Sequence, residues 1–232
     1  MEEKSKTPLL IFDLDGTLVD SSLQIFCCIN EARKVLLYPE LDYETFLEKF
    51  GLPIEVILDD LNLETHQLDS LVNRFRQFLA LEVQRNNIIY SGVEAFLLRA
   101  RDFGFKTAIA TSKPTNMAEL VVNNSLLSNY IDFTQGTDDF PAKPEPDVII
   151  KCLDYFKTTY GLMFGDRIED VLAANLAHIP CIGVAQGHHS AAQLRQVGAI
   201  KVYDNFLELS LDADQLFKIF TAEFSATDED VK

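Results

Sequence analysis

The sequence contains no long hydrophobic run. No stretch approaches the roughly 20 apolar residues that a membrane-spanning helix requires. The first residues, MEEKSKTP, contain acids and a proline, and the apolar run that follows, residues 9–12, stops at Asp13. A signal peptide needs a longer apolar segment behind a basic start. We therefore expect a cytoplasmic protein with neither a signal peptide nor a membrane segment.

Basic residues are scarce. The chain has 20 Lys and Arg against 36 Asp and Glu, for a net charge of -16, and the acids are spread along its length. A surface that neutralises the phosphates of a nucleic acid needs the opposite balance. This composition argues against a nucleic-acid partner, and the charge of any anionic ligand must be met by local groups.

Cysteine is also scarce. The four cysteines are Cys27, Cys28, Cys152 and Cys181, without C-x-x-C spacing. Two of them are adjacent, which suits neither a zinc site nor a simple disulfide pair. We interpret them as reduced residues that pack in the interior.

The 232 residues, 47% of them apolar, suffice for one medium domain, or for a core with a smaller insert. Short apolar runs alternate with segments of helical periodicity, which predicts an α/β fold with a parallel sheet whose strands are covered on both faces. Helices are predicted from about Val93 and over residues 147–156. The predicted strands are residues 9–12, 106–110, 161–164, 181–185 and 201–203.

Residues 20–90 differ from the rest, because they show helical periodicity without strand-like runs. The clearest pattern is Leu68, Leu71, Val72, Phe75 and Leu79. We predict a core formed by residues 1–19 and 91–232 and a helical cap formed by residues 20–90. A helical insert after the first strand could act as a lid.

Polar residues follow three of the apolar runs. Because the carboxyl ends of parallel strands meet at one edge of the sheet, these residues should converge there. They are Asp13 and Asp15 after the first run, Thr111 and Ser112 after the second, and Gly165 and Asp166 after the third.

Two interpretations fit Asp13 and Asp15. They could serve turn formation, which Asp and Gly favour. Alternatively, one carboxylate attacks phosphorus while the other handles protons, since an ionised carboxylate is a nucleophile at neutral pH without a base. Asp15 would then protonate the leaving alkoxide and later accept a proton from the attacking water.

Asp166 and Asp170 are spaced i to i+4 in GDRIED. Acids are common at a helix start, whose dipole favours them, so this pair alone is ambiguous. Together with Asp13 and Asp15 it forms a hard, oxygen-rich site that suits Mg²⁺. A divalent cation would offset the repulsion among these carboxylates.

A cation is also needed beside an anionic nucleophile and an anionic phosphate. Lys143, between Pro141 and Pro144, is the candidate, although a lone lysine is usually a solvated surface residue. Thr111 and Ser112 could donate hydrogen bonds to phosphate oxygens, as could the start of the helix expected at about Pro114. We expect the competing cation, Lys113, to face solvent.

DLDGT at 13–17, Thr111, Lys143 and GDRIED at 165–170, in that order, resemble the four motifs of the haloacid dehalogenase superfamily. The stretches YSGVEAFL, TSKP and AKPEPDVI resemble its phosphoglycolate phosphatase-like branch, which has a Rossmann-like core and a helical cap. The resemblance implies a nucleophile, an acid/base, two phosphate ligands and Mg²⁺ ligands. The implied nucleophile is Asp13, and the implied acid/base is Asp15. Thr111 and Lys143 would bind the phosphate. Asp166, with Asp170 beside it, would bind Mg²⁺, and the backbone carbonyl of Asp15 would complete the metal site.

The chain also departs from the family pattern. Arg167 stands where the family usually has a small polar residue, and it could either lend charge to the site or point outward. We interpret His188 and His189, in AQGHHS, as solvated loop residues. The segment FGLP, residues 50–53, is either a plain turn or the part of the cap that touches substrate.

The leading hypothesis is a Mg²⁺-dependent phosphatase that hydrolyses a small phosphomonoester through an aspartyl-phosphate. A phosphomutase is an alternative, but the sugar phosphomutases of the superfamily carry His at the position of Ile25. A catalytically silent phosphate-binding protein is the other alternative. The particular ester and the oligomeric state do not follow from the sequence.

Overall fold

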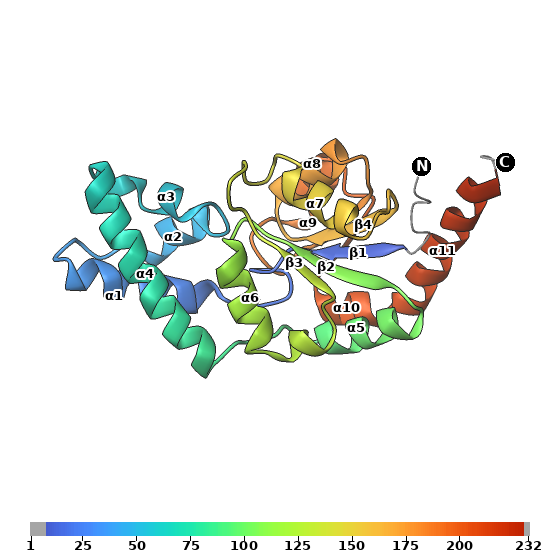
Figure 1. Ribbon diagram of the computed structural model, residues 1–232, viewed down its shortest axis with the longest axis horizontal. Helices are drawn as coiled ribbons and strands as arrows, with labels where there is room; N and C mark the ends of the chain where they lie inside the picture. Colours follow the sequence, from blue (N-terminus) through green and yellow to red (C-terminus); the bar gives the residue numbers. More distant parts are fainter. Residues whose placement is uncertain (1–7, 230–232) are drawn as a thin grey trace.

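The computed structural model describes residues 8–229, with side chains described through residue 222. Its centre is a sheet of six strands in the order β3-β2-β1-β4-β5-β6, and every neighbouring pair is parallel (Figure 1). The strands are β1 (Leu9–Phe12), β2 (Lys106–Ala110), β3 (Phe133–Gln135), β4 (Gly161–Gly165), β5 (Cys181–Val184) and β6 (Lys201–Tyr203).

Helices cover both faces of the sheet, as parallel strands joined by crossovers require. One face packs against α5 (Val93–Asp102), α6 (Thr115–Asn123), α10 (Phe206–Leu211) and α11 (Ala213–Glu229). The other packs against α7 (Asp147–Tyr155), α8 (Ile168–Leu176) and α9 (Ala191–Gln196). The α/β fold with a parallel sheet, predicted from the sequence, is confirmed.

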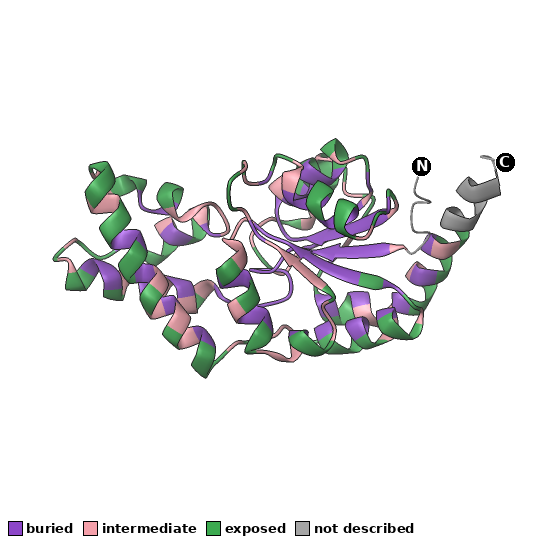
Figure 2. Ribbon diagram, viewed as in Figure 1, coloured by how far each residue is buried: buried purple, intermediate pink, exposed green. Residues whose placement is uncertain are grey.

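The position of β1 inside the sheet, between β2 and β4, explains why its sequence is uniformly apolar. Leu10 and Phe12 point into the larger of the two cores, and Leu9 and Ile11 point into the other. Side chains alternate between faces along a strand, so a strand covered on both sides buries all of them. Phe12 stacks on Phe164 of β4 with ring centroids 4.9 Å apart. Figure 2 shows these central strands as buried.

Four α-helices lie between β1 and α5 along the chain and stand beside the sheet, not on its faces (Figure 1). The helical insert consists of α1 (Ser22–Val35), α2 (Tyr43–Lys49), α3 (Ile54–Ile57), the 3₁₀ turn η1 (Asp59–Leu61) and α4 (Thr65–Arg85). Buried residues on α4 include Leu71, Val72, Phe75 and Leu79, so the predicted helix is confirmed. The division at residues 19/20 and 90/91 into core and cap stays a prediction.

The five strands predicted from apolar runs are confirmed, with ends that differ by at most one residue. The sixth, β3, escaped prediction because its three residues, Phe133–Gln135, are only half-buried and form no apolar run. It lies at the edge of the sheet, where one side is unpaired. Among the described residues, no helix is both long and apolar enough to cross a membrane.

Candidate active site

The register of the sheet brings three strand ends together. Phe12, the last residue of β1, lies opposite Ile109 of β2 on one side and Phe164 of β4 on the other. The backbone N–H of Asp13 continues this ladder, donating to the carbonyl of Phe164 over 2.9 Å. Asp13 therefore lies between the ends of β2 and β4, at the edge where parallel sheets bind ligands.

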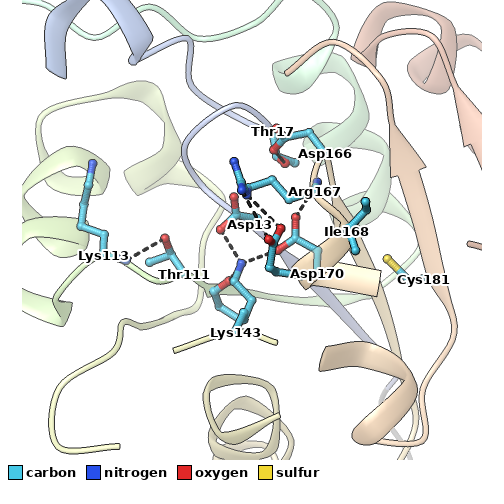
Figure 3. Close-up of polar contacts among 12 residues, drawn as sticks. Asp13, Thr17, Thr111, Lys113, Lys143, Asp166, Arg167, Ile168, Asp170 and Cys181 are labelled. Carbon is cyan, nitrogen blue, oxygen red and sulfur yellow. Dashed lines mark hydrogen bonds and ion pairs between the residues drawn. The ribbon is translucent and has the colours of Figure 1, made fainter. Parts of the chain in front are cut away.

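Three carboxylates converge at this edge (Figure 3). Each of Asp13, Asp166 and Asp170 offers an oxygen, and these oxygens lie within 4.8 Å of one another. Their exposed fractions are 5%, 0% and 0%. Three buried carboxylates around one point form a hard oxygen donor set, which fits Mg²⁺. Ligation of a metal by these residues stays a prediction.

Burial and the mutual repulsion of the carboxylates raise the pKa values of Asp13 and Asp166. Burial, reinforced by Asp170 and Asp15 and only partly offset by Lys143, raises the pKa of Asp13 from 3.8 to about 6. Burial together with Asp170 and Asp13 raises the pKa of Asp166 to about 8. The protein alone thus favours protonation of these acids, and a bound cation would reverse that preference.

Lys143 is the buried cation of the site. Its Nζ donates to Asp13 Oδ1 over 2.6 Å, to Asp170 Oδ1 over 2.5 Å and to the carbonyl of Ala110 over 2.9 Å. Although burial disfavours its charged form, Asp13 and Asp170 keep its pKa above the ordinary lysine value. The ammonium is therefore charged and held against the carboxylate that the sequence indicates as the nucleophile.

Asp15 lies close by, but its side chain contacts other residues than Lys143. Its carboxylate accepts hydrogen bonds from Ser21 Oγ and from Lys113 Nζ. Its side chain is not part of the three-carboxylate cluster, so any metal contact from Asp15 would come from its backbone carbonyl, as the family resemblance implies. The expectation that Lys113 faces solvent is wrong, because the length of its side chain lets the ammonium reach back to Asp15.

The carboxylate of Asp166 is held by several donors. Thr17 Oγ1 donates to Asp166 Oδ1 and the N–H of His188 donates to Asp166 Oδ2, both over 2.8 Å. Gly16 makes this approach possible, since its φ is +87° and a Cβ there would lie 2.6 Å from Asp166 Oδ2. The sequence does not predict the hydrogen bonds from Thr17 and His188 to Asp166, although Thr17 belongs to the DLDGT motif.

Thr111 and Ser112 line the same cavity as Asp13 and Lys143, which has a volume of about 260 Å³. They lie between the end of β2 and the start of α6, as expected for phosphate ligands. The segment formed by residues 50–53 also lines the cavity, from the side of the helical insert. The structure thus brings all the sequence-predicted site residues to one cavity and its immediate border.

Comparison with known proteins identifies the family. The profile of the haloacid dehalogenase-like hydrolases matches residues 10–184. The chain belongs to this family. The membership and the hydrolase class inferred from the four motifs are confirmed.

The relatives resemble the chain over nearly its whole length. One is described as "Probable phosphatase IndB" of Dickeya dadantii, 29% identical over 94% of this chain and 98% of the relative. Another is a phosphoglycolate phosphatase of Colwellia psychrerythraea, 27% identical over 87% of this chain and 94% of the relative. A solved structure of a hydrolase from Pseudomonas syringae is 27% identical, with a TM-score of 0.75, over 90% of this chain and 99% of that one.

Arg167 follows Asp166 in the chain, and the structure shows what its side chain contacts. The side chain is buried, its Nη1 donates to the carbonyl of Phe50 in the helical insert, and its Nε donates to Glu169 Oε2 over 3.1 Å. It passes over Gly51, where a Cβ would lie 2.7 Å from Arg167 Cδ. Arg167 therefore connects the start of α8, next to Asp166, with the helical insert.

The histidines of the AQGHHS loop are only half-buried, and the imidazole of His189 accepts a hydrogen bond. His189 Nδ1 accepts the N–H of Ile168 over 3.2 Å, at the start of α8. Burial, with the nearby charge of Arg167, lowers the pKa of His188 to about 4. The interpretation of both as solvated loop residues is therefore wrong in part, because the loop folds against Asp166.

Proposed function

We propose that the protein is a Mg²⁺-dependent phosphatase that hydrolyses a small phosphomonoester through an aspartyl-phosphate on Asp13. The observation that carries this proposal is the buried contact of Lys143 Nζ with Asp13 Oδ1, 2.6 Å long, beside Asp166 and Asp170. A buried carboxylate next to a fixed ammonium is suited to attack an anionic group that the same ammonium attracts. Relatives named as phosphatases support the same activity.

In the first step Lys143, Thr111 and Ser112 hold the phosphate oxygens. An oxygen of Asp13 forms a bond to phosphorus as the bond from phosphorus to the ester oxygen breaks. Asp15, on the side of the cavity where Lys113 and Ser21 hold it, gives its proton to the departing alkoxide.

In the second step water attacks the phosphorus of the aspartyl-phosphate. Asp15, now ionised, takes a proton from that water as the bond from phosphorus to Asp13 breaks. Inorganic phosphate and the Asp13 carboxylate are the products, so the site returns to its starting state.

Asp13, Asp166, Asp170 and the backbone carbonyl of Asp15 would hold Mg²⁺. When bound, Mg²⁺ supplies positive charge that shields the carboxylates from the phosphate and stabilises the transition state. Thr17 and the N–H of His188 would keep Asp166 oriented toward that position.

The direct test is hydrolysis of an aryl phosphate by the purified protein with and without Mg²⁺. We expect activity that requires Mg²⁺ and is lost in Asp13→Asn. Full activity in that variant would refute the mechanism. Binding of Mg²⁺ and phosphate without turnover over a broad panel of esters would instead show a silent binding protein, and isomerisation of a sugar phosphate faster than phosphate release would show a mutase.

A further inference from the structure

The cavity that starts at Asp13 ends against an apolar wall. Four helices contribute to it: α1, α3 and α4 of the insert, and α6 of the core. The buried members of this wall are at most 7% exposed, so they are fixed parts of the interior and not mobile surface groups. They are Ile25, Ile57, Phe75, Leu79 and Met117.

The cations nearest the reaction centre are already paired. Lys113 Nζ lies 2.8 Å from Asp15. Arg167 donates to Glu169 through Nε and Nη2 and to the insert backbone through Nη1. Neither group is free to receive a second negative charge unless it first gives up a buried partner, which is unfavourable.

Arg76, the remaining cation of the lining, also has a carboxylate partner. Arg76 lies 4.0 Å from Glu55, and their side chains are 40% and 51% exposed. A second anionic group on the substrate would therefore meet apolar side chains and cations that already have carboxylate partners.

We infer that, given the proposed phosphatase function, the preferred substrate is the phosphate ester of an uncharged alcohol with an apolar body, aliphatic or aromatic. The phosphate lies at Asp13 and Lys143, and the alcohol's body contacts the wall formed by Ile25, Ile57, Phe75, Leu79 and Met117. An acidic alcohol such as glycolate fits this cavity less well, because its carboxylate would be desolvated without a free cation.

A matched pair of esters tests the inference. Isobutyl phosphate is phosphoglycolate with the carboxylate replaced by an isopropyl group of the same size. We expect kcat/KM for isobutyl phosphate to exceed that for phosphoglycolate by about tenfold or more, the scale of discrimination in an apolar pocket. Equal values, or a preference for phosphoglycolate, would overturn the inference and leave the proposed function standing.

Binding supplies a readout that does not depend on turnover. The non-hydrolysable counterparts are 3-methylbutylphosphonate and 3-phosphonopropionate, titrated calorimetrically into the wild-type protein with Mg²⁺. Tighter binding of the apolar phosphonate by about tenfold or more would support the inference even if neither ester were hydrolysed, a result that would refute only the proposed function. Equal or weaker binding of the apolar phosphonate, or none, would overturn the inference.

Two substitutions on the short helix α3 locate the effect. Ile54 lines the cavity, whereas Val56 of the same helix does not and is 40% exposed. Ile54→Lys should lower the preference for isobutyl phosphate over phosphoglycolate about tenfold or more, while Val56→Lys should leave it unchanged. A preference that does not move in Ile54→Lys, or that falls equally in both variants, would contradict the placement of the alcohol's body in this cavity.

Discussion

Lys113 Nζ lies 2.8 Å from the carboxylate of Asp15, and the two side chains are only 9% and 10% exposed. The contact joins residues from two different strand ends, 98 positions apart in the sequence. Because Asp15 is the proposed proton donor and acceptor, the ammonium that holds it becomes part of the proposed site.

Replacement of Lys113 tests this assignment. A charge-assisted hydrogen bond contributes roughly 1.5–3 kcal/mol, so Lys113→Met should lower kcat/KM for an aryl phosphate about 10- to 100-fold. Steady-state kinetics with the aryl phosphate measures this decrease in kcat/KM. The matched control is Lys106→Met, since Lys106 is 47% exposed and pairs with Asp132 away from the cavity. Similar rates in the two variants would show that Lys113 has no role in the site.

Arg167 offers a second test, because it connects the Asp166 segment to the helical insert. In Arg167→Ser the carbonyl of Phe50 loses its donor, and the segment formed by residues 50–53 loses a contact that holds it at the cavity. We expect kcat/KM to fall about tenfold, the scale produced by small errors in substrate placement. The comparison is Arg195→Ser, an exposed arginine on α9. An unchanged kcat/KM in folded Arg167→Ser would contradict the proposed support.

Metal binding should depend on pH in a defined direction. Folding raises the pKa of Asp13 to about 6 and that of Asp166 to about 8, from 3.8. The folded, metal-free protein therefore keeps protons that the unfolded chain has released, so these groups destabilise the fold increasingly as the pH rises from about 4 to about 8. Mg²⁺ binds the deprotonated acids, so its stabilising effect should grow over the same range.

The measurement is the Tm with and without Mg²⁺ at several pH values. The increase in Tm caused by Mg²⁺ should be larger at about pH 8 than at about pH 5, and it should be small at both in Asp166→Asn. An increase that is the same at every pH, or that survives in Asp166→Asn, would show that Mg²⁺ acts elsewhere.

Much of the fold followed from local patterns. The apolar run at 9–12 predicted β1 because a strand covered on both faces must be apolar throughout. The helical period of α4 predicted its buried side in the same way. The edge strand β3 lacks such a pattern, since only part of each of its residues is buried and its pairing with β2 depends on the rest of the fold.

The candidate site was predictable where residues follow strand ends, because topology alone brings those positions together. Asp13, Thr111 and Asp166 are of this kind. The contacts of Lys113 and Arg167 were not predictable, since they depend on where a long side chain turns after its backbone leaves the strand end. The half-burial of His188 likewise depends on how its loop folds back on Asp166.

In the proposed mechanism Asp13 carries the phosphoryl group during the reaction. The most direct measurement is mass spectrometry of the protein quenched in acid during turnover of an aryl phosphate with Mg²⁺, followed by peptide mapping. We expect one added phosphoryl group on Asp13, enriched in Asp15→Asn, which lacks the group that activates water. Turnover without any phosphorylated Asp13, together with full activity of Asp13→Asn, would refute the aspartyl-phosphate mechanism.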